Sequence, residues 1–323
     1  MTNVKRILVT GAAGFIGYHT ALALKDHHVV GYDNFDPYYS VELKKERARR
    51  LKEAGIEVIN ADINDKHTLF QLMEKERFTH IIHLAAQAGV RYSLKAPEAY
   101  IRSNIDGFLS VLELVRKYPE TKLVYASSSS VYGLNEKIPY SIHDRTDSQA
   151  SLYGVTKKSN ELMAQTYHHL FDADCVGLRF FTVYGPWGRP DMAYFSFSQA
   201  IMEGKAIELY NFGNCMRDFT YIDDIVAGIL GALDLDRGNR VFNLGNHEPV
   251  TLMEFVETLE VVIGKKAEKR LLPMQPGDVT QTFADIKESS EALNFYPKTS
   301  LKEGLSHFVK WGKEYCVLTG FSK

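Results

Sequence analysis

The sequence has few cysteines and no long apolar segment. Its 323 residues include three cysteines, which lack the Cys-x-x-Cys spacing of a metal or redox site: Cys175, Cys215 and Cys316. We therefore expect free thiols, no bound metal and a reducing, cytoplasmic environment. No stretch approaches the roughly 20 apolar residues of a membrane-spanning helix. The short apolar run at residues 6–11 is typical of a strand and not of the core of a signal peptide.

An excess of charge of one sign is also lacking. The formal net charge is −2, so overall electrostatics does not favour nucleic acid or an anionic membrane as a partner. Residues 43–52 are locally basic but contain no aromatic side chain that stacks on a base. We interpret this segment as a solvated amphipathic helix and not as a nucleic-acid site. With 45% hydrophobic residues, the chain can fill the cores of one or two domains.

Short apolar runs alternate with helical patterns in the first half of the chain. We predict buried strands at residues 7–10, 29–33, 57–60, 80–84, 123–127 and 175–179, and one more at 241–244. This alternation predicts a parallel sheet covered by helices on both faces. Residues 1–180, with 221–247 returning to them, form the first predicted domain. Residues 181–220 and 248–323, with a helix near 193–203, form a smaller lobe, and the cleft lies at the carboxyl ends of the strands.

A glycine-rich turn follows the first predicted strand and opens a helix. It reads Gly11-x-x-Gly14-Phe15-Ile16-Gly17. Glycines permit a tight turn and a close approach of backbone to a pyrophosphate, and the helix N-terminus offers free N–H groups to the anion. The alternative is an ordinary strand–helix turn. The position of the turn in the alternating pattern favours a dinucleotide site in a Rossmann-type doubly wound parallel sheet with a smaller C-terminal α/β substrate lobe.

Polar and small residues follow the next predicted strands. Asp33 lies 22 residues after Gly11 and precedes Asn34. A carboxylate there accepts hydrogen bonds from ribose hydroxyls and repels a 2′-phosphate, which favours NAD over NADP as the cofactor. We expect further cofactor contacts from residues near the ends of the third to fifth strands and the helix after the fourth: Asp62, Ile63, Leu84, Ala85, Ala86, Asn104 and Ser127.

Tyr153 and Lys157 lie four residues apart and therefore on one face of a helix. A free phenol ionises near pH 10. An adjacent ammonium and a positively charged nicotinamide would lower the pKa of Tyr153 by roughly 3 units, or about 4 kcal/mol, and give a base near pH 7. The spacing alone is common, but the serines at 127–130 end the fifth strand at the same sheet edge. We choose Ser128 as the hydroxyl that contacts the reacting oxygen; the alternative is a polar loop.

Together these motifs resemble extended short-chain dehydrogenases/reductases that act on nucleotide sugars. Narrower stretches resemble UDP-glucuronate 4-epimerases: residues 32–39, 88–94, 179–192 and 273–279. The resemblance implies Tyr153 as the base, Lys157 as its partner, Ser128 beside them and a bound NAD. For the UDP-sugar it implies these contacts: Arg91, Ser128, Ser129, Thr182, Arg189, Arg217 and Asp278. It also implies a homodimer through a four-helix bundle built from the helices around 106–116 and 153–169.

Three departures distinguish the chain from related chemistries. Sugar dehydratases carry Asp-Glu where Ser129 and Ser130 stand, and decarboxylases carry a glutamate at the second position. Hydroxyls are weak general acids, so loss of water or carbon dioxide is disfavoured. Simple UDP-galactose 4-epimerases carry asparagine in place of Thr182. We therefore predict inversion of carbon 4 of UDP-glucuronate. A UDP-hexose 4-epimerase or a decarboxylase remains the alternative, and a non-catalytic NAD-sensing module is a remote one.

A uronic acid adds a hazard, because its 4-keto form is a β-keto acid that can lose carbon dioxide. Arginine binds a carboxylate through two parallel hydrogen bonds. Our hypothesis is that Arg189, with Thr182, holds the sugar carboxylate out of the alignment that decarboxylation needs. The alternative for Arg189 is a solvent-facing loop residue.

Overall fold

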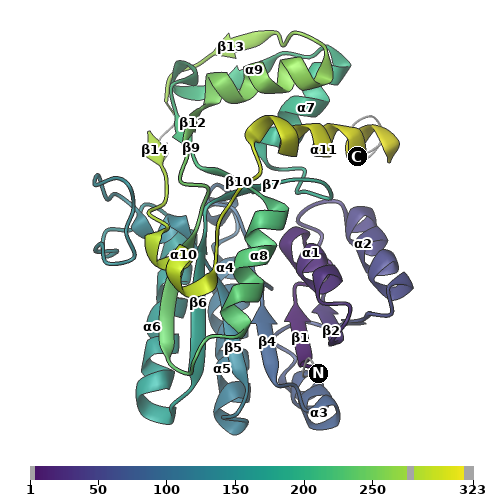
Figure 1. Ribbon diagram of the computed structural model, residues 1–323, viewed down its shortest axis with the longest axis vertical. Coiled ribbons are helices and arrows are strands. Elements are labelled where there is room, and N and C mark those ends of the chain that lie inside the picture. Colours follow the sequence, from purple (N-terminus) through teal and green to yellow (C-terminus); the bar gives the residue numbers. More distant parts are fainter. Residues whose placement is uncertain (1–3, 275–279, 316–323) are drawn as a thin grey trace.

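The computed structural model describes residues 4–274 and 280–315 (Figure 1). Its main feature is a seven-stranded sheet in which each neighbouring pair is parallel, in the order β11-β6-β5-β4-β1-β2-β3. The strands are β1 (Arg6–Thr10), β2 (His28–Asp33), β3 (Glu57–Asn60), β4 (His80–His83), β5 (Lys122–Ser128), β6 (Asp174–Phe180) and β11 (Asn239–Leu244). The predicted α/β fold with a doubly wound sheet is confirmed, including the late return of residues 241–244 to the sheet edge.

Helices cover both faces of the sheet, as the alternation of buried residues requires. In β1, Ile7 and Val9 belong to one core and Leu8 to the other. Because successive side chains of a strand point to opposite faces, a doubly covered strand reads as continuously apolar. One core contains α1 (Phe15–Ala23), α2 (Val41–Glu53) and α8 (Ile222–Leu233), and the other contains α3 (Lys66–Glu76), α5 (Gly107–Lys117) and α6 (Leu152–Phe171).

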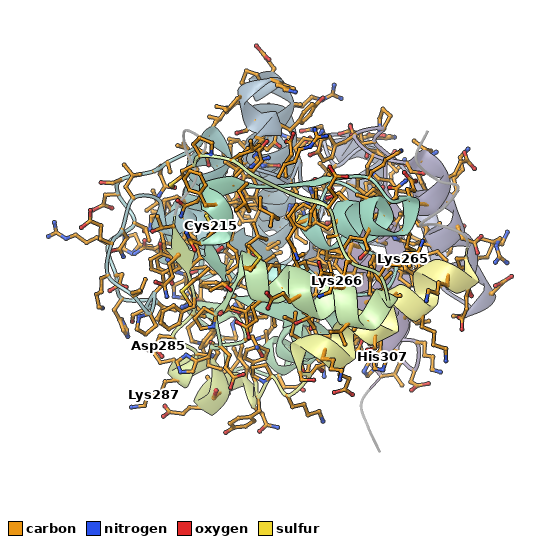
Figure 2. All side chains as sticks on the ribbon, turned by 90° about the horizontal axis from the view of Figure 1, so that it is seen from above. Cys215, Lys265, Lys266, Asp285, Lys287 and His307 are labelled. Atoms are coloured by element: carbon orange, nitrogen blue, oxygen red, sulfur yellow. The ribbon has the colours of Figure 1, made fainter. Side chains whose placement is uncertain are left out.

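The remaining elements lie mostly beyond the carboxyl ends of the sheet strands (Figure 1). Three small sheets pair β7 (Thr182–Tyr184) with β10 (Phe219–Tyr221), β8 (Ile207–Leu209) with β13 (Lys269–Leu271), and β9 (Met216–Arg217) with β12 (Val250–Thr251) and β14 (Gln281–Thr282). The helices are α4 (Pro97–Tyr100), α7 (Ala193–Glu203), α9 (Leu252–Ile263), α10 (Lys287–Leu293) and α11 (Leu301–Glu314). The predicted helix near 193–203 is α7. In the view of Figure 2, Lys265 and Lys266 lie just after α9, and His307 lies on α11.

The basic segment at 43–52 is helical, but it is not simply solvated. It lies in α2, where Lys44 and Arg47 are buried, Arg47 completely. The Arg47 guanidinium donates to the carbonyls of Ala13, Trp187 and Gly188. The prediction of a solvent-exposed basic face is therefore wrong at these two positions, because distant backbone carbonyls supply the partners that a buried cation needs. Among the described residues, no helix combines the length and the apolar character needed to cross a membrane.

Candidate active site

A cavity of about 480 Å³ is lined by residues at and just after the carboxyl ends of the sheet strands. Most of the predicted site residues line it: Gly11, Gly14, Phe15, Ile16, Gly17, Asp33, Asn34, Ile63, Leu84, Ala85, Ala86, Ser127, Ser128, Ser129, Tyr153, Lys157, Thr182, Arg189 and Arg217. These residues come from strands and loops separated by up to about two hundred positions. They meet because parallel strands deliver their carboxyl ends to a single edge of the sheet.

The glycine turn packs too closely for side chains and ends in an open helix terminus. Gly11 has a φ of 71°, and a Cβ there would lie 2.8 Å from the backbone of Leu84 and Ala85. A Cβ on Gly17 would lie 2.0 Å from the Gly11 carbonyl oxygen. No side chain caps the start of α1 at Gly14. The turn therefore fits a pyrophosphate, which binds to free N–H groups at a helix N-terminus.

Asp33 is fixed at the end of β2 by its own backbone contacts. Its carboxylate accepts N–H bonds from Ala13 at 3.0 Å and from Phe35 at 2.8 Å. Burial raises the pKa of Asp33, and these hydrogen bonds and Lys44 offset part of that effect. Asp33 lines the cavity, and each carboxylate oxygen can accept one more hydrogen bond, which suits two ribose hydroxyls. The site therefore fits NAD by the chemistry of its donors and acceptors.

Three predicted contacts do not line the cavity in the described part of the chain. Asp62 is engaged by Asn34, Asn64 and Arg102, and it is the neighbouring Ile63 that reaches the cavity. Arg91 lies over the Tyr210 ring at 5.4 Å. The third, Asn104, is described next. Asp278, also a predicted contact, lies outside the described residues.

Asn104 is the third of these contacts and is buried below the cavity. Its side chain accepts the Gln87 N–H at 2.8 Å and donates to the Gln87 carbonyl at 3.0 Å. It also donates to the Thr156 hydroxyl on α6 at 3.0 Å. Asn104 lies in a π-helical turn, Ile101–Asp106. It thus supports the loop after β4 and does not face the cofactor site, because all its polar atoms are used within the protein.

The reacting groups lie where β5 ends beside α6. The Lys157 ammonium donates to the Ala126 carbonyl at 2.8 Å, and Tyr153 hydrogen-bonds Ser128. Burial lowers the pKa of Lys157 to about 8. Burial raises the pKa of Tyr153, while the bond from Ser128 and the charge of Arg189 pull it down. In the protein alone desolvation dominates, and the Lys157 ammonium donates to the Ala126 backbone. The predicted fall in the pKa of Tyr153, which included the charge of a bound nicotinamide, stays a prediction.

Two arginines that line the cavity already have partners within the chain. The Arg189 guanidinium donates to both oxygens of Asp191, at 3.1 and 2.6 Å. Arg217, in β9, donates to the Met216 carbonyl at 2.9 Å. Thr182, the first residue of β7, also lines the cavity. Arg189 is therefore a cavity residue and not a solvent-facing one, but its fork is occupied by a carboxylate of its own chain.

Several cavity residues were not predicted. One of them is Tyr38, which donates to Asp191 at 3.0 Å. Gln87 and Tyr140 also line the cavity. Tyr38 falls within the 32–39 stretch that carries the family resemblance, so the resemblance could have identified it as a cavity residue. Tyr140 precedes α6 in an irregular segment with no motif, and the sequence offers no comparable signal for it.

Residues 7–245 match a family described as "Epimerase: NAD dependent epimerase/dehydratase family". The chain is 49% identical over 329 residues to UDP-glucuronate 4-epimerase 2 of Arabidopsis thaliana, covering 96% of this chain and 76% of that protein. It is 51% identical over 312 residues to an uncharacterized protein of Methanocaldococcus jannaschii, covering 95% and 96% of the two chains.

Two solved structures are similar over almost the whole chain. A UDP-glucuronic acid 4-epimerase from Bacillus cereus, in complex with UDP-glucuronic acid and NAD, has a TM-score of 0.88 and 37% identity, covering 96% of this chain and 99% of that one. A UDP-glucose 4-epimerase from Thermotoga maritima, with UDP-glucose, has a TM-score of 0.87 and 29% identity at the same coverage. The fold is thus common to enzymes for both kinds of sugar, whereas the higher sequence identity lies with the uronate enzyme.

Proposed function

Because the chain belongs to the NAD dependent epimerase/dehydratase family, we propose that it inverts carbon 4 of UDP-glucuronate and forms UDP-galacturonate. The observation that carries this proposal is that Tyr153 and Arg189 line the same cavity as the glycine turn. One cavity therefore contains a candidate base, a cofactor site and a cation that can bind a carboxylate. The enzyme is an isomerase with NAD as its cofactor.

Tyr153 acts as the base in this reaction. Its phenolate removes the proton of the 4-hydroxyl, and Ser128 hydrogen-bonds the same phenol. Bound NAD⁺ supplies the acceptor, and then the donor, of the hydride at carbon 4. After the 4-keto sugar turns about its bond to the diphosphate, Tyr153 returns the proton and the opposite configuration results. Lys157, with a pKa of about 8, is mostly protonated at pH 7 and adds positive charge behind the phenolate.

The two parts of the chain divide the binding work in this proposal. Residues 1–180, with 221–247, bind NAD through the glycine turn and Asp33. The buried Lys44 ammonium favours the ionised form of Asp33. Residues 181–220 and 248–323 bind the nucleotide sugar. Arg217 and the predicted contact Asp278 hold the diphosphate and ribose of UDP, because a guanidinium pairs with phosphate in a fixed fork. Thr182, Ser129 and Arg189 face the sugar.

A UDP-hexose 4-epimerase is the second candidate. The observation that favours it is the Arg189–Asp191 ion pair, which neutralises the cation that a uronate carboxylate would need. A hexose, with a neutral hydroxymethyl group, makes no such demand. A decarboxylase is less well supported, since Ser130 stands where a glutamate is required.

One assay separates these functions. The purified protein is given UDP-glucuronate and UDP-glucose in separate reactions, and the products are identified by proton NMR. We expect UDP-galacturonate from the first and at most slow conversion of the second. Exclusive turnover of UDP-glucose would favour the hexose enzyme, and UDP-pentose as the main product of UDP-glucuronate would favour the decarboxylase.

A matched pair of variants on α6 tests the base. Tyr153→Phe removes the proton acceptor, so turnover should fall by about 10³-fold while NAD stays bound. Tyr167→Phe is the control, because Tyr167 lies on the same helix but bonds Glu113, away from the cavity. Equal activity of the two variants would remove Tyr153 from the role of base.

We also propose a cytoplasmic homodimer. Cys175 and Cys215 are unpaired and buried, which suits a reducing compartment. Helix α6 exposes apolar side chains about two helical turns apart, at Val155, Leu162 and the adjacent pair Leu170 and Phe171. Such a face is typical of a helix that packs against another copy. Light scattering of the parent and of Leu162→Asp tests the proposal, with a dimer expected for the parent and a monomer for the variant.

A further inference from the structure

Three polar residues lie in one row across the carboxyl ends of β5, β6 and β11. Ser127 is the register partner of Arg179, and Arg179 is the register partner of Asn243. Side chains of directly opposed residues project to the same face of a sheet. All three are almost fully buried. The row therefore places hydrogen-bonding groups inside the protein, where each group requires a partner.

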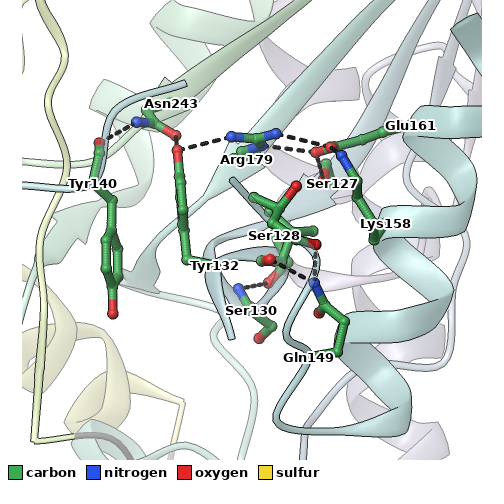
Figure 3. Close-up of polar contacts among 12 residues, drawn as sticks. Ser127, Ser128, Ser130, Tyr132, Tyr140, Gln149, Lys158, Glu161, Arg179 and Asn243 are labelled. Atoms are coloured by element: carbon green, nitrogen blue, oxygen red, sulfur yellow. Dashed lines mark hydrogen bonds and ion pairs between the residues drawn. The ribbon is translucent and has the colours of Figure 1, made fainter. Parts of the chain in front are cut away.

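Glu161 of α6 supplies the partners for two members of this row (Figure 3). Its carboxylate accepts two hydrogen bonds from Arg179, at 2.8 and 2.9 Å, and one from the Ser127 hydroxyl at 2.7 Å. The side chains of Glu161 and Arg179 are 5% and 4% exposed. The attraction to Arg179 holds the pKa of Glu161 below its usual range against the effect of burial. The carboxylate is thus ionised, and removing it would leave a buried cation without a counter-charge.

Hydrogen bonds also connect this row to Tyr132 and Tyr140. Arg179 donates to the Tyr132 hydroxyl at 3.0 Å, which donates to the Asn243 side chain at 2.7 Å. Asn243 in turn donates to the Tyr140 carbonyl at 2.8 Å, and the rings of Tyr132 and Tyr140 stack with centres 4.4 Å apart. Tyr140 lines the cavity. One connected network therefore supports both the serine strand end and the irregular segment that contains Tyr140 (Figure 3).

Glu161 also completes a regular pattern on α6. Tyr153, Lys157 and Glu161 are spaced by four residues and lie on one face of the helix. Three consecutive residues of β5 receive them: Tyr153 bonds Ser128, Lys157 bonds the Ala126 carbonyl, and Glu161 bonds Ser127. The first two contacts involve the reacting groups. The third is made by Glu161, which does not line the cavity, and it holds the same strand end to the same helix.

From this geometry we infer that Glu161, paired with Arg179, is a positioning residue. It fixes the end of β5 against α6 and so keeps Ser128 within hydrogen-bonding distance of Tyr153. The inference rests on the proposed epimerisation. An epimerase must let its keto sugar turn over inside the site, so the sugar cannot organise the reacting side chains. The protein has to hold them, and a displacement of about 1 Å at a reacting group can cost about 10²-fold in rate.

The main test replaces the ion pair by apolar side chains, as Glu161→Leu with Arg179→Met, so that no unpaired charge stays buried. We expect kcat to fall by about 100-fold, while bound NAD and the KM for UDP-glucuronate stay within about threefold of the parent. Glu161→Gln with Arg179→Met also avoids an unpaired buried charge but keeps a side-chain oxygen that accepts from Ser127, so kcat should stay within about tenfold of the parent.

Glu260→Leu is the matched control. Glu260 is also a buried carboxylate with two lysine partners, Lys266 and Lys269, but it lies on α9 outside the cavity lining. Its loss should lower the melting temperature without changing kcat by more than about threefold. A double variant that behaves like Glu260→Leu would overturn the inference. So would a fall in kcat that comes with an equal loss of bound NAD, which would indicate general loosening of the site.

Ser127→Ala covers the case in which the double variant does not fold. It leaves the ion pair intact and removes only the link to the strand end, so kcat should again fall with KM little changed. Unchanged kcat in Ser127→Ala would refute the role of Glu161. The parent protein is assayed first. A parent that does not invert carbon 4 refutes the proposed function, whereas an active parent with unaffected variants refutes only this inference.

Discussion

Arg189 and Asp191 form a two-point ion pair beside the cavity, with nitrogen–oxygen distances of 3.1 and 2.6 Å. Tyr38 donates to the same carboxylate at 3.0 Å. The guanidinium fork that would receive a sugar carboxylate is thus held by the chain itself. A uronate must therefore compete with Asp191 or use the remaining N–H groups of Arg189. Mutation of Asp191 should then change the preference for a UDP-uronate over a UDP-hexose.

Asp191→Asn should strengthen binding of the uronate. The change removes a competing negative charge worth about 1 kcal/mol for a partly exposed pair, so KM for UDP-glucuronate should fall about fivefold. KM for a UDP-hexose should stay unchanged, because its carbon 6 carries no charge. Steady-state kinetics with both sugars checks this. Asp234→Asn is the control, since it removes a carboxylate paired with Lys5 at the start of β1. An unchanged KM for UDP-glucuronate would mean that Arg189 does not meet the sugar carboxylate.

Arg189→Ala should release carbon dioxide from part of the substrate. Without the guanidinium, the carboxylate of the 4-keto sugar is free to align perpendicular to the ketone plane. We expect more UDP-pentose per turnover than from the parent, measured by NMR of the product mixture. Arg237→Ala is the control, because Arg237 bonds Pro119 and Asp172 and does not line the cavity. A product mixture equal to that of the parent would refute the hypothesis that Arg189 prevents decarboxylation.

Ser128→Ala should shift the acid limb of the kcat profile to higher pH. Burial raises the pKa of Tyr153, and the hydrogen bond from Ser128 lowers it. Removing that bond raises the pKa of the base, so less phenolate is present at a given pH. With a bond worth about 1.4 kcal/mol, kcat at pH 7 should fall about tenfold and recover as the pH rises. Ser159→Ala, on the exposed side of α6, should leave the profile unchanged. A uniform loss at every pH would instead indicate that Ser128 only places the substrate.

The sequence predicted those parts of the structure that local patterns determine. Most of the strands and the glycine turn were found because a buried parallel strand is continuously apolar and a tight turn needs glycine at Gly11. The strand at 57–60 was found too, but the prediction that it is buried is wrong, because β3 is an edge strand with exposed ends. The helix predicted near residues 193–203 is α7. Tyr153, Lys157 and Ser128 were brought together by the rule that parallel strands and their following helices meet at one sheet edge.

The sequence was less informative where a partner lies far away in the chain. Asp62 and Ile63 are adjacent, and only the path of the backbone decides which of them reaches the cavity. The direction of the pKa shift of Tyr153 depends on burial and on where the Lys157 ammonium points. Neither quantity is present in the Tyr-x-x-x-Lys spacing.

Arg47 is the clearest case of a residue whose partners could not be predicted from the sequence. Arg47 and Arg49 carry the same charge in the same helix, yet Arg47 is fully buried and Arg49 is exposed. The difference arises because residues 140 positions later supply carbonyls to Arg47. These contacts connect the glycine turn at Ala13 with the segment that contains Arg189.

Arg47→Met should therefore destabilise the protein and weaken its hold on NAD. The variant leaves buried carbonyls of Ala13, Trp187 and Gly188 without donors, at a total cost of about 3 kcal/mol. For a chain of this size the melting temperature should fall by about 4 °C, measured by differential scanning calorimetry. Arg49→Met, on the exposed face of the same helix, should change stability by less than about 0.5 kcal/mol, because its ion pairs are with solvent-exposed glutamates. Equal melting temperatures for the two variants would show that the buried guanidinium does not hold the two cavity segments together.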